Sequence, residues 1–223
     1  MIAFWTLLAV AAAVALVDWV AVARDDARLE YLAKPGVLIA LTAACAVLPD
    51  SHTDLVDRKW WFVAALVLCL LGDVLLMVPR DLFVAGLGAF LVGHLLYIGG
   101  LLQAPSPPGS PPFAFSTTGL VVASLIGTAY AAVPATRIFG ALTRGGQRAL
   151  VPPVAVYLVV ILTMAVLAAN VGAPVALAGA ALFVLSDTIL AVNRFVRPLP
   201  GGNVAVHVTY HLAQGLLVLS LLR

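Results

Sequence analysis

Charged residues are scarce in this chain of 223 residues, since only 10% are Asp, Glu, Lys or Arg whereas 63% are hydrophobic. A soluble domain has about a quarter of its residues charged. The composition therefore excludes a soluble globular protein, because its surface could not be built from this mixture. The net charge of only +2 gives no indication of a nucleic-acid partner. The sequence predicts a single integral membrane domain over residues 1–223.

Cysteine is also rare, with Cys45 and Cys69 as the two examples. Both lie inside apolar runs, so we interpret them as packed thiols that carry no information about redox compartment. The N-terminus lacks a basic segment and a small-residue cleavage pattern before Asp18 and Trp19. We therefore interpret the first apolar run as a retained span, not a signal peptide.

Long apolar runs are abundant, and a spanning helix needs about 20 mostly apolar residues. Proline and charge clusters separate the runs, where helices are expected to stop. The predicted fold is an all-α, polytopic membrane bundle of eight transmembrane helices. The predicted spans are 2–22, 34–48, 60–78, 83–102, 115–133, 150–171, 175–192 and 204–222.

Lys and Arg are distributed unevenly between the two sets of loops. The connections after the odd-numbered predicted helices hold Arg24, Arg28, Lys34, Arg80, Arg137, Arg144, Arg148, Arg194 and Arg197, and the other side holds Arg58, Lys59 and Arg223. Because basic loops stay in the cytoplasm, we expect a multi-pass protein of the cell membrane with the odd-numbered loops cytoplasmic. Both termini would then be extracytoplasmic.

The two halves of the chain resemble each other weakly. The segment "LGDVLLMV" at 71 is similar to "LSDTILAV" at 185, and His94 and His211 are separated by a similar interval. A proline-rich stretch, "APSPPGSPP" at 104–112, lies between the halves. These features predict two parallel four-helix repeats, 1–103 and 113–223, joined by a proline-rich loop.

Asp73 and Asp187 are carboxylates inside apolar runs, where a charge costs several kcal/mol unless it is paired or hydrated. Most of the polar side chains compared with them fall at a similar depth, roughly 8 to 15 Å from the end that carries the odd-numbered loops, at 1.5 Å per helical residue. The side chains compared are Tyr157, Tyr210, His211 and Gln214, with His94 and Tyr97 near the centre of the fourth predicted helix and Lys34 at the start of the second. Their convergence predicts a polar cavity that opens toward the cytoplasmic side.

Each of these residues also has a structural interpretation. Asp73 could form an ion pair with Lys34, and Asp187 could be a neutral acid that bonds another helix. His94 could be a satisfied interior histidine. The tyrosines could pack with one hydrogen bond each, and a serine at this depth could bond its own helix.

Several motifs in order along the chain resemble the YhhN-like membrane proteins, a family that includes lysoplasmalogenases. They are "KPGVLIAL" at 34, "LGDVLLM" at 71, "FLVGHLLYI" at 90, "GAALFVLSDTILAVNRF" at 179 and "TYHLAQGLL" at 209. The resemblance implies an eight-helix bundle that hydrolyses the vinyl-ether bond of lysoplasmalogens, giving a fatty aldehyde and a glycerophospho head group. It also implies a site lined by Lys34, Asp73, His94, Tyr157, Ser186, Asp187, Tyr210 and Gln214.

Vinyl-ether hydrolysis needs a proton donor for the outer alkene carbon and a carboxylate that stabilises the resulting oxocarbenium ion. Paired carboxylates do similar work in glycoside hydrolysis. We therefore expect Asp73 and Asp187 to be catalytic, with either one as the acid. Lys34 would bind the lipid phosphate, while His94 and the tyrosines would orient water or relay protons. The expected partners are a lysophospholipid and the bilayer, with no cofactor.

Three alternatives come from the same residues. His207 and His211 stand at i and i+4, a spacing suited to zinc in a metal-dependent lipid hydrolase. Two buried aspartates also suit an intramembrane aspartyl protease, although Leu70 stands where that motif has glycine before Leu71, Gly72 and Asp73. Buried carboxylates with an internal repeat equally suit a proton-coupled transporter of a small or lipid-like solute.

Overall fold

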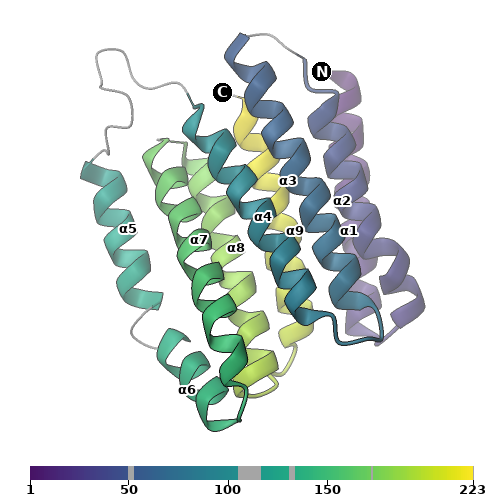
Figure 1. Cartoon of the computed structure of the whole chain (residues 1–223). Helices are drawn as coiled ribbons and strands as arrows, with labels where there is room; N and C mark the ends of the chain where they lie inside the picture. Colours follow the sequence, from purple (N-terminus) through teal and green to yellow (C-terminus); the bar gives the residue numbers. More distant parts are fainter. Residues whose placement is uncertain (50–52, 105–116, 131–133, 172, 223) are drawn as a thin grey trace.

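The computed structural model describes residues 1–49, 53–104, 117–130, 134–171 and 173–222 (Figure 1). The regular structure in these ranges is helical, without a strand. The main helices are α1 (Ile2–Ala23), α2 (Ala27–Ala46), α3 (Thr53–Met77), α4 (Phe83–Leu102), α5 (Thr117–Tyr130), α6 (Thr136–Arg144), α7 (Val151–Asn170), α8 (Pro174–Ala191) and α9 (Gly202–Leu219).

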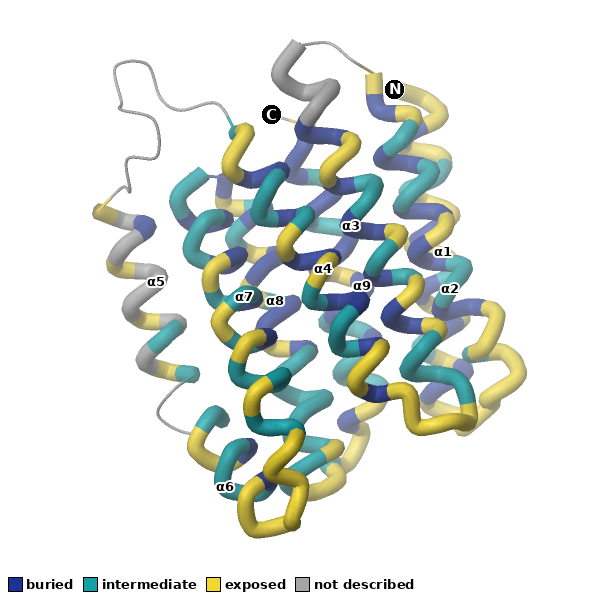
Figure 2. The backbone as a smooth tube through the Cα atoms, viewed as in Figure 1, coloured by how far each residue is buried: buried dark blue, intermediate teal, exposed yellow. Residues whose placement is uncertain are grey.

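Seven helices in the described ranges are long and apolar enough to cross a membrane. This confirms the all-α, multi-pass fold class. Large apolar side chains such as Ile2, Leu32 and Val159 are mostly exposed on the outside of the bundle, as expected where lipid is the solvent (Figure 2). The described part of the predicted fifth span is α5, with 14 residues, and the rest of that span lies outside the described residues.

The second helix begins earlier than predicted. Its first residue is Ala27, not Lys34, and Pro35 lies inside it. Asp26 caps this helix because its carboxylate accepts a hydrogen bond from the backbone N–H of Leu29 at 3.2 Å. Proline at this depth is tolerated because neighbouring membrane helices can compensate for the lost backbone bond. Lys34 is therefore about 10 Å along the helix axis from its start.

A short helix, α6, was not predicted. It follows α5 at the lower end of the bundle in Figure 1. Ile138 and Leu142, four residues apart, are the buried positions of α6, whereas Arg137 and Arg144 are not. This spacing places the two apolar side chains on one helical face, so α6 lies against the bundle with that face inward.

Successive helices pack side by side: α1 against α2, α2 against α3, α3 against α4, and likewise α7 against α8 and α8 against α9. The halves meet where α4 contacts α7 and α9 contacts α1 and α2. Both termini lie at the same end of the bundle (Figure 1). Which end faces the cytoplasm stays a prediction, as does the two-repeat organisation. Most of the proline-rich stretch lies outside the described residues.

Glycines allow α3 and α4 to approach closely beside Asp73. A Cβ added at Gly72 would lie 2.6 Å from the ring of Phe90, and one added at Gly86 would lie 2.7 Å from a methyl group of Leu76. Small residues commonly permit such contacts between membrane helices. The close packing fixes the position of the chain segment that carries Asp73.

Candidate functional site

A polar cavity of about 440 Å³ lies inside the bundle. It extends from the α1–α2 connection and the start of α2, where Asp25 and Ala27 are exposed, into the space between α2, α3, α8 and α9. Residues from six helices, which include α1 and α4, and from one connection therefore meet in it. Its lining is Val22, Asp25, Ala27, Glu30, Tyr31, Lys34, Asp73, Leu76, Met77, Phe90, Ser186, Asp187, Leu190, Asn203, Val206, His207 and Tyr210.

Asp73 is almost completely buried and both of its oxygens are engaged. Lys34 Nζ lies 3.2 Å from Oδ1, and the hydroxyl of Tyr210 donates a hydrogen bond to Oδ2 at 2.8 Å. Lys34 is itself buried in the protein. The ion pair considered from the sequence is thus present, and both of its members line the polar cavity. A cation and a hydroxyl donor favour the ionised form of a carboxylate.

Asp187 has different surroundings. The hydroxyl of Tyr157 donates to its Oδ2 at 2.5 Å, and within the described ranges no Lys or Arg forms an ion pair with Asp187. Asp187 lines the polar cavity and also a second, apolar pocket. Asp73 and Asp187, from α3 and α8, therefore face one cavity, but among the described residues only Asp73 has a cationic partner.

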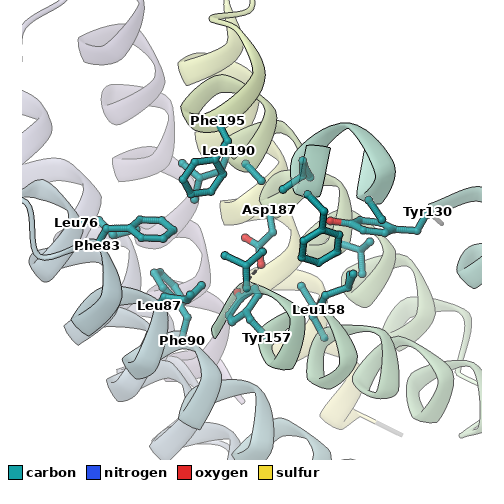
Figure 3. Close-up of a pocket in the computed structure, with 17 residues that line it drawn as sticks. Leu76, Phe83, Leu87, Phe90, Tyr130, Tyr157, Leu158, Asp187, Leu190 and Phe195 are labelled. Atoms are coloured by element: carbon teal, nitrogen blue, oxygen red, sulfur yellow. Dashed lines mark hydrogen bonds between the residues drawn. The ribbon is translucent and has the colours of Figure 1, made fainter. Parts of the chain in front are cut away.

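The apolar pocket lies on the other side of Asp187, between α4, α6, α7 and α8 (Figure 3). Phenylalanine and leucine side chains surround the carboxylate there, and the Tyr157 hydroxyl points toward it (Figure 3). Ile138 and Phe139 of α6 close one side of the pocket. The pocket has about 60 Å³ of free space, and it shares Leu76, Phe90, Asp187 and Leu190 with the polar cavity.

Three of the predicted site residues lie in a fully buried layer and are not among the side chains that line the cavity. His94 makes a hydrogen bond of 2.6 Å between Nδ1 and the carbonyl oxygen of Phe90, and its ring packs edge-on against Tyr157 and Phe183. The hydroxyl of Tyr97 donates to Gln214. His94, Tyr97 and Gln214 thus support the wall of the site.

Ser186 lines the polar cavity. Its hydroxyl donates to the carbonyl oxygen of Val206 in α9 at 3.1 Å. The bond therefore joins α8 to α9, and is not made within the serine's own helix. Ser186 fixes the two helices that carry Asp187 and Tyr210 relative to each other.

Asp18, which was not predicted as a site residue, is completely buried in α1. Its Oδ2 lies 2.6 Å from His207 Nδ1 and 3.7 Å from His211 Nδ1. The signal that identified Asp73 and Asp187, a carboxylate in an apolar run near a helix end, applies equally to Asp18. Glu30, which also lines the cavity, was missed because it precedes the predicted start of the second helix.

His207 and His211 turn toward Asp18, and the ring centroids of the two histidines are 6.0 Å apart. Among the residues that the structure describes, no three His, Cys, Asp or Glu side chains are grouped so that they could hold a metal ion. The zinc alternative would therefore need a further ligand beyond this pair.

The helices and the cavity define a multi-pass helical membrane protein with an ionisable site at membrane depth. The YhhN family model matches residues 29–221, and the chain belongs to this family. It is 32% identical over 159 residues to the human protein named lysoplasmalogenase TMEM86B, covering 71% of this chain and 62% of that one. It is 34% identical over 166 residues to the pig protein of the same name, covering 70% and 61%.

A protein from Mycobacterium tuberculosis named lysoplasmalogenase is 32% identical over 174 residues, which cover 76% of this chain and 61% of that protein. This chain therefore spans about three fifths of the length of these relatives. No solved structure matches it. Asp18 lies before the first residue that the family model matches.

Proposed function

We propose that this protein is a hydrolase that cleaves the vinyl-ether bond of lysoplasmalogens to a fatty aldehyde and a glycerophospho head group. The observation that carries the proposal is the position of Asp73 and Asp187, which face one polar cavity beside an apolar pocket. The lysoplasmalogenase names of relatives in mammals and mycobacteria support the same substrate class.

The two adjoining spaces suit a lipid with a polar head and one chain. The glycerophospho part would occupy the polar cavity, and the alkenyl chain would extend past Asp187 toward the apolar pocket. This pose would place the vinyl-ether bond near Asp187, at the boundary between the two spaces. Lys34 contacts Asp73, which favours a role in holding that carboxylate over the alternative role of binding the phosphate.

The different surroundings of the aspartates suggest their roles. Asp187, which no cation accompanies within the described residues, would stay neutral in this low-dielectric setting and donate its proton to the outer alkene carbon. Asp73, held ionised by Lys34 and Tyr210, would stabilise the positive charge of the oxocarbenium ion. Water then adds to the cation, and the hemiacetal collapses to the aldehyde.

The test is aldehyde release by the purified protein in detergent. We expect release from a lysoplasmalogen, and none from the matching alkyl-ether or acyl lysophospholipid, because neither forms an oxocarbenium ion by protonation of an alkene. Since no gradient exists in detergent, turnover would also separate an enzyme from a transporter. Activity should persist after chelation of metal ions. Wild-type protein that leaves the lysoplasmalogen intact would contradict the proposal.

A further inference from the structure

A buried histidine–carboxylate pair adjoins the polar cavity. Asp18 is 0% exposed and His207 is 6% exposed, and the 2.6 Å contact between Asp18 Oδ2 and His207 Nδ1 joins α1 to α9. A carboxylate at this depth is costly unless it is paired. The pair therefore explains how α1 can carry a carboxylate inside its span.

The contact with Asp18 engages one ring nitrogen of His207 and leaves the other, Nε2, available to exchange a proton. In a neutral ring, a proton on Nδ1 can be donated to the Asp18 carboxylate, which leaves Nε2 as the basic nitrogen. Nε2 lies 3.6 Å from Glu30 Oε1, which is longer than an ordinary hydrogen bond. His207 and Glu30 both line the polar cavity. The basic nitrogen is thus on the side of His207 that adjoins this space.

Asp73 is poorly placed to take up a proton from water. One of its oxygens contacts Lys34 and the other accepts from Tyr210, so both favour a carboxylate that stays ionised. His207 also lines the cavity, and its Nδ1 contacts the carboxylate of Asp18. A carboxylate in this position stabilises a histidine when it gains a proton.

We propose that His207 is a third catalytic residue, which carries a proton during the reaction, and that Asp18 is its positioning residue. The proposal rests on the proposed vinyl-ether hydrolysis. Asp187 gives its proton to the alkene carbon, and the alkene electron pair forms the new C–H bond. Water then forms a C–O bond at the cationic carbon while His207 Nε2 accepts one water proton, which gives the neutral hemiacetal.

Collapse of the hemiacetal restores both groups. His207 returns its proton to the glycerol oxygen as the C–O bond breaks, and the bonding electron pair goes to that oxygen. The remaining hydroxyl becomes the aldehyde carbonyl and gives its proton to Asp187. The sum is one vinyl ether plus one water giving one aldehyde and one alcohol, with Asp187 neutral and His207 unprotonated as at the start.

His211 provides a matched control in the same helix. It is buried like His207 and lies near the same carboxylate. Its Nδ1, however, accepts a hydrogen bond of 3.1 Å from Trp19 Nε1, and its ring lines an apolar groove between α1, α2 and α9. His211 therefore shares the structural setting of His207 without facing the polar cavity.

The experiment compares His207→Asn with His211→Asn in the purified full-length protein. The asparagine at 207 keeps a donor for Asp18 but cannot carry a proton. We expect kcat for aldehyde release to fall at least about 100-fold in His207→Asn with KM little changed, and to stay near wild type in His211→Asn. Thermal unfolding of both variants is measured in parallel.

Two further variants separate catalysis from folding. In His207→Ala, added imidazole should restore turnover, because the cavity gives a small base access to the vacated position. Asp18→Asn should lower kcat at least about tenfold, and imidazole should not restore it. Equal losses in His207→Asn and His211→Asn, full activity in His207→Asn, or failure of imidazole to restore His207→Ala would overturn the proposal. Wild-type protein without activity would instead contradict the proposed function.

Discussion

Asp73 and Asp187 occupy similar positions in similar sequence segments, yet their surroundings differ. Asp73 contacts a lysine and a tyrosine hydroxyl inside a polar cavity. Asp187 receives one tyrosine hydroxyl and borders a pocket lined by phenylalanine and leucine side chains (Figure 3). Two alike motifs can therefore supply two unlike carboxyl groups, because protonation depends on neighbours contributed by other helices.

The largest expected effect comes from removing either carboxylate. Asp187→Asn and Asp73→Asn should each lower kcat at least about 1,000-fold, since one removes the proton donor and the other removes the stabilising charge. The measurement is aldehyde release by the purified variants. Asp81→Asn is the control, because Asp81 is exposed and pairs with Arg194 at the surface, where a pair contributes little. Full activity in both single variants would end the assignment.

A smaller effect should follow from removing the cation beside Asp73. Lys34→Gln leaves a buried carboxylate without its charged partner, which typically costs about 3 kcal/mol of stability. We expect lower thermal stability and reduced turnover. The double variant Lys34→Gln, Asp73→Asn should be more stable than Lys34→Gln alone, because the unpaired charge is gone. A double variant less stable than Lys34→Gln would show that an unpaired Asp73 charge is not the cause of the lost stability.

The smallest expected effect concerns the pocket beside Asp187. Val154→Trp should narrow the apolar pocket that Val154 lines and shift preference toward shorter alkenyl chains by about tenfold in kcat/KM. The lipid-facing Val156, 53% exposed, gives the control Val156→Trp. Chain-length preference is measured on a series of lysoplasmalogens. Identical chain-length preferences in the two variants would show that the alkenyl chain does not bind in this pocket.

Much of the fold follows from composition and apolar run length. The fourth span was predicted with its observed ends, Phe83–Leu102, because Pro79 and Gln103 interrupt the apolar sequence near both of them. The predicted start of the second helix was wrong because the polar segment before Lys34 resembles a loop, whereas the Asp26 cap starts the helix at Ala27. The amphipathic α6 was missed because its nine residues contain too few apolar positions to suggest a span.

Site residues could be predicted from the sequence where a polar residue interrupts an apolar run. Their hydrogen-bond and ion-pair partners on other helices could not. The interruptions identified Asp73 and Asp187, and Asp18 satisfies the same rule. Pairing depends on which helices are neighbours, so the contact of α1 with α9 that brings Asp18 to His207 was not accessible from local pattern. For the same reason the sequence left either aspartate as the acid.

In the proposed mechanism, Asp187 is neutral and Asp73 is ionised in the resting protein. Infrared spectroscopy of the purified protein near neutral pH tests this claim directly, through the carbonyl stretch of a protonated carboxyl group and its shift in D₂O. We predict that Asp187→Asn loses a band of this kind, while Asp73→Asn retains it. A band that persists in Asp187→Asn and disappears in Asp73→Asn would contradict the account.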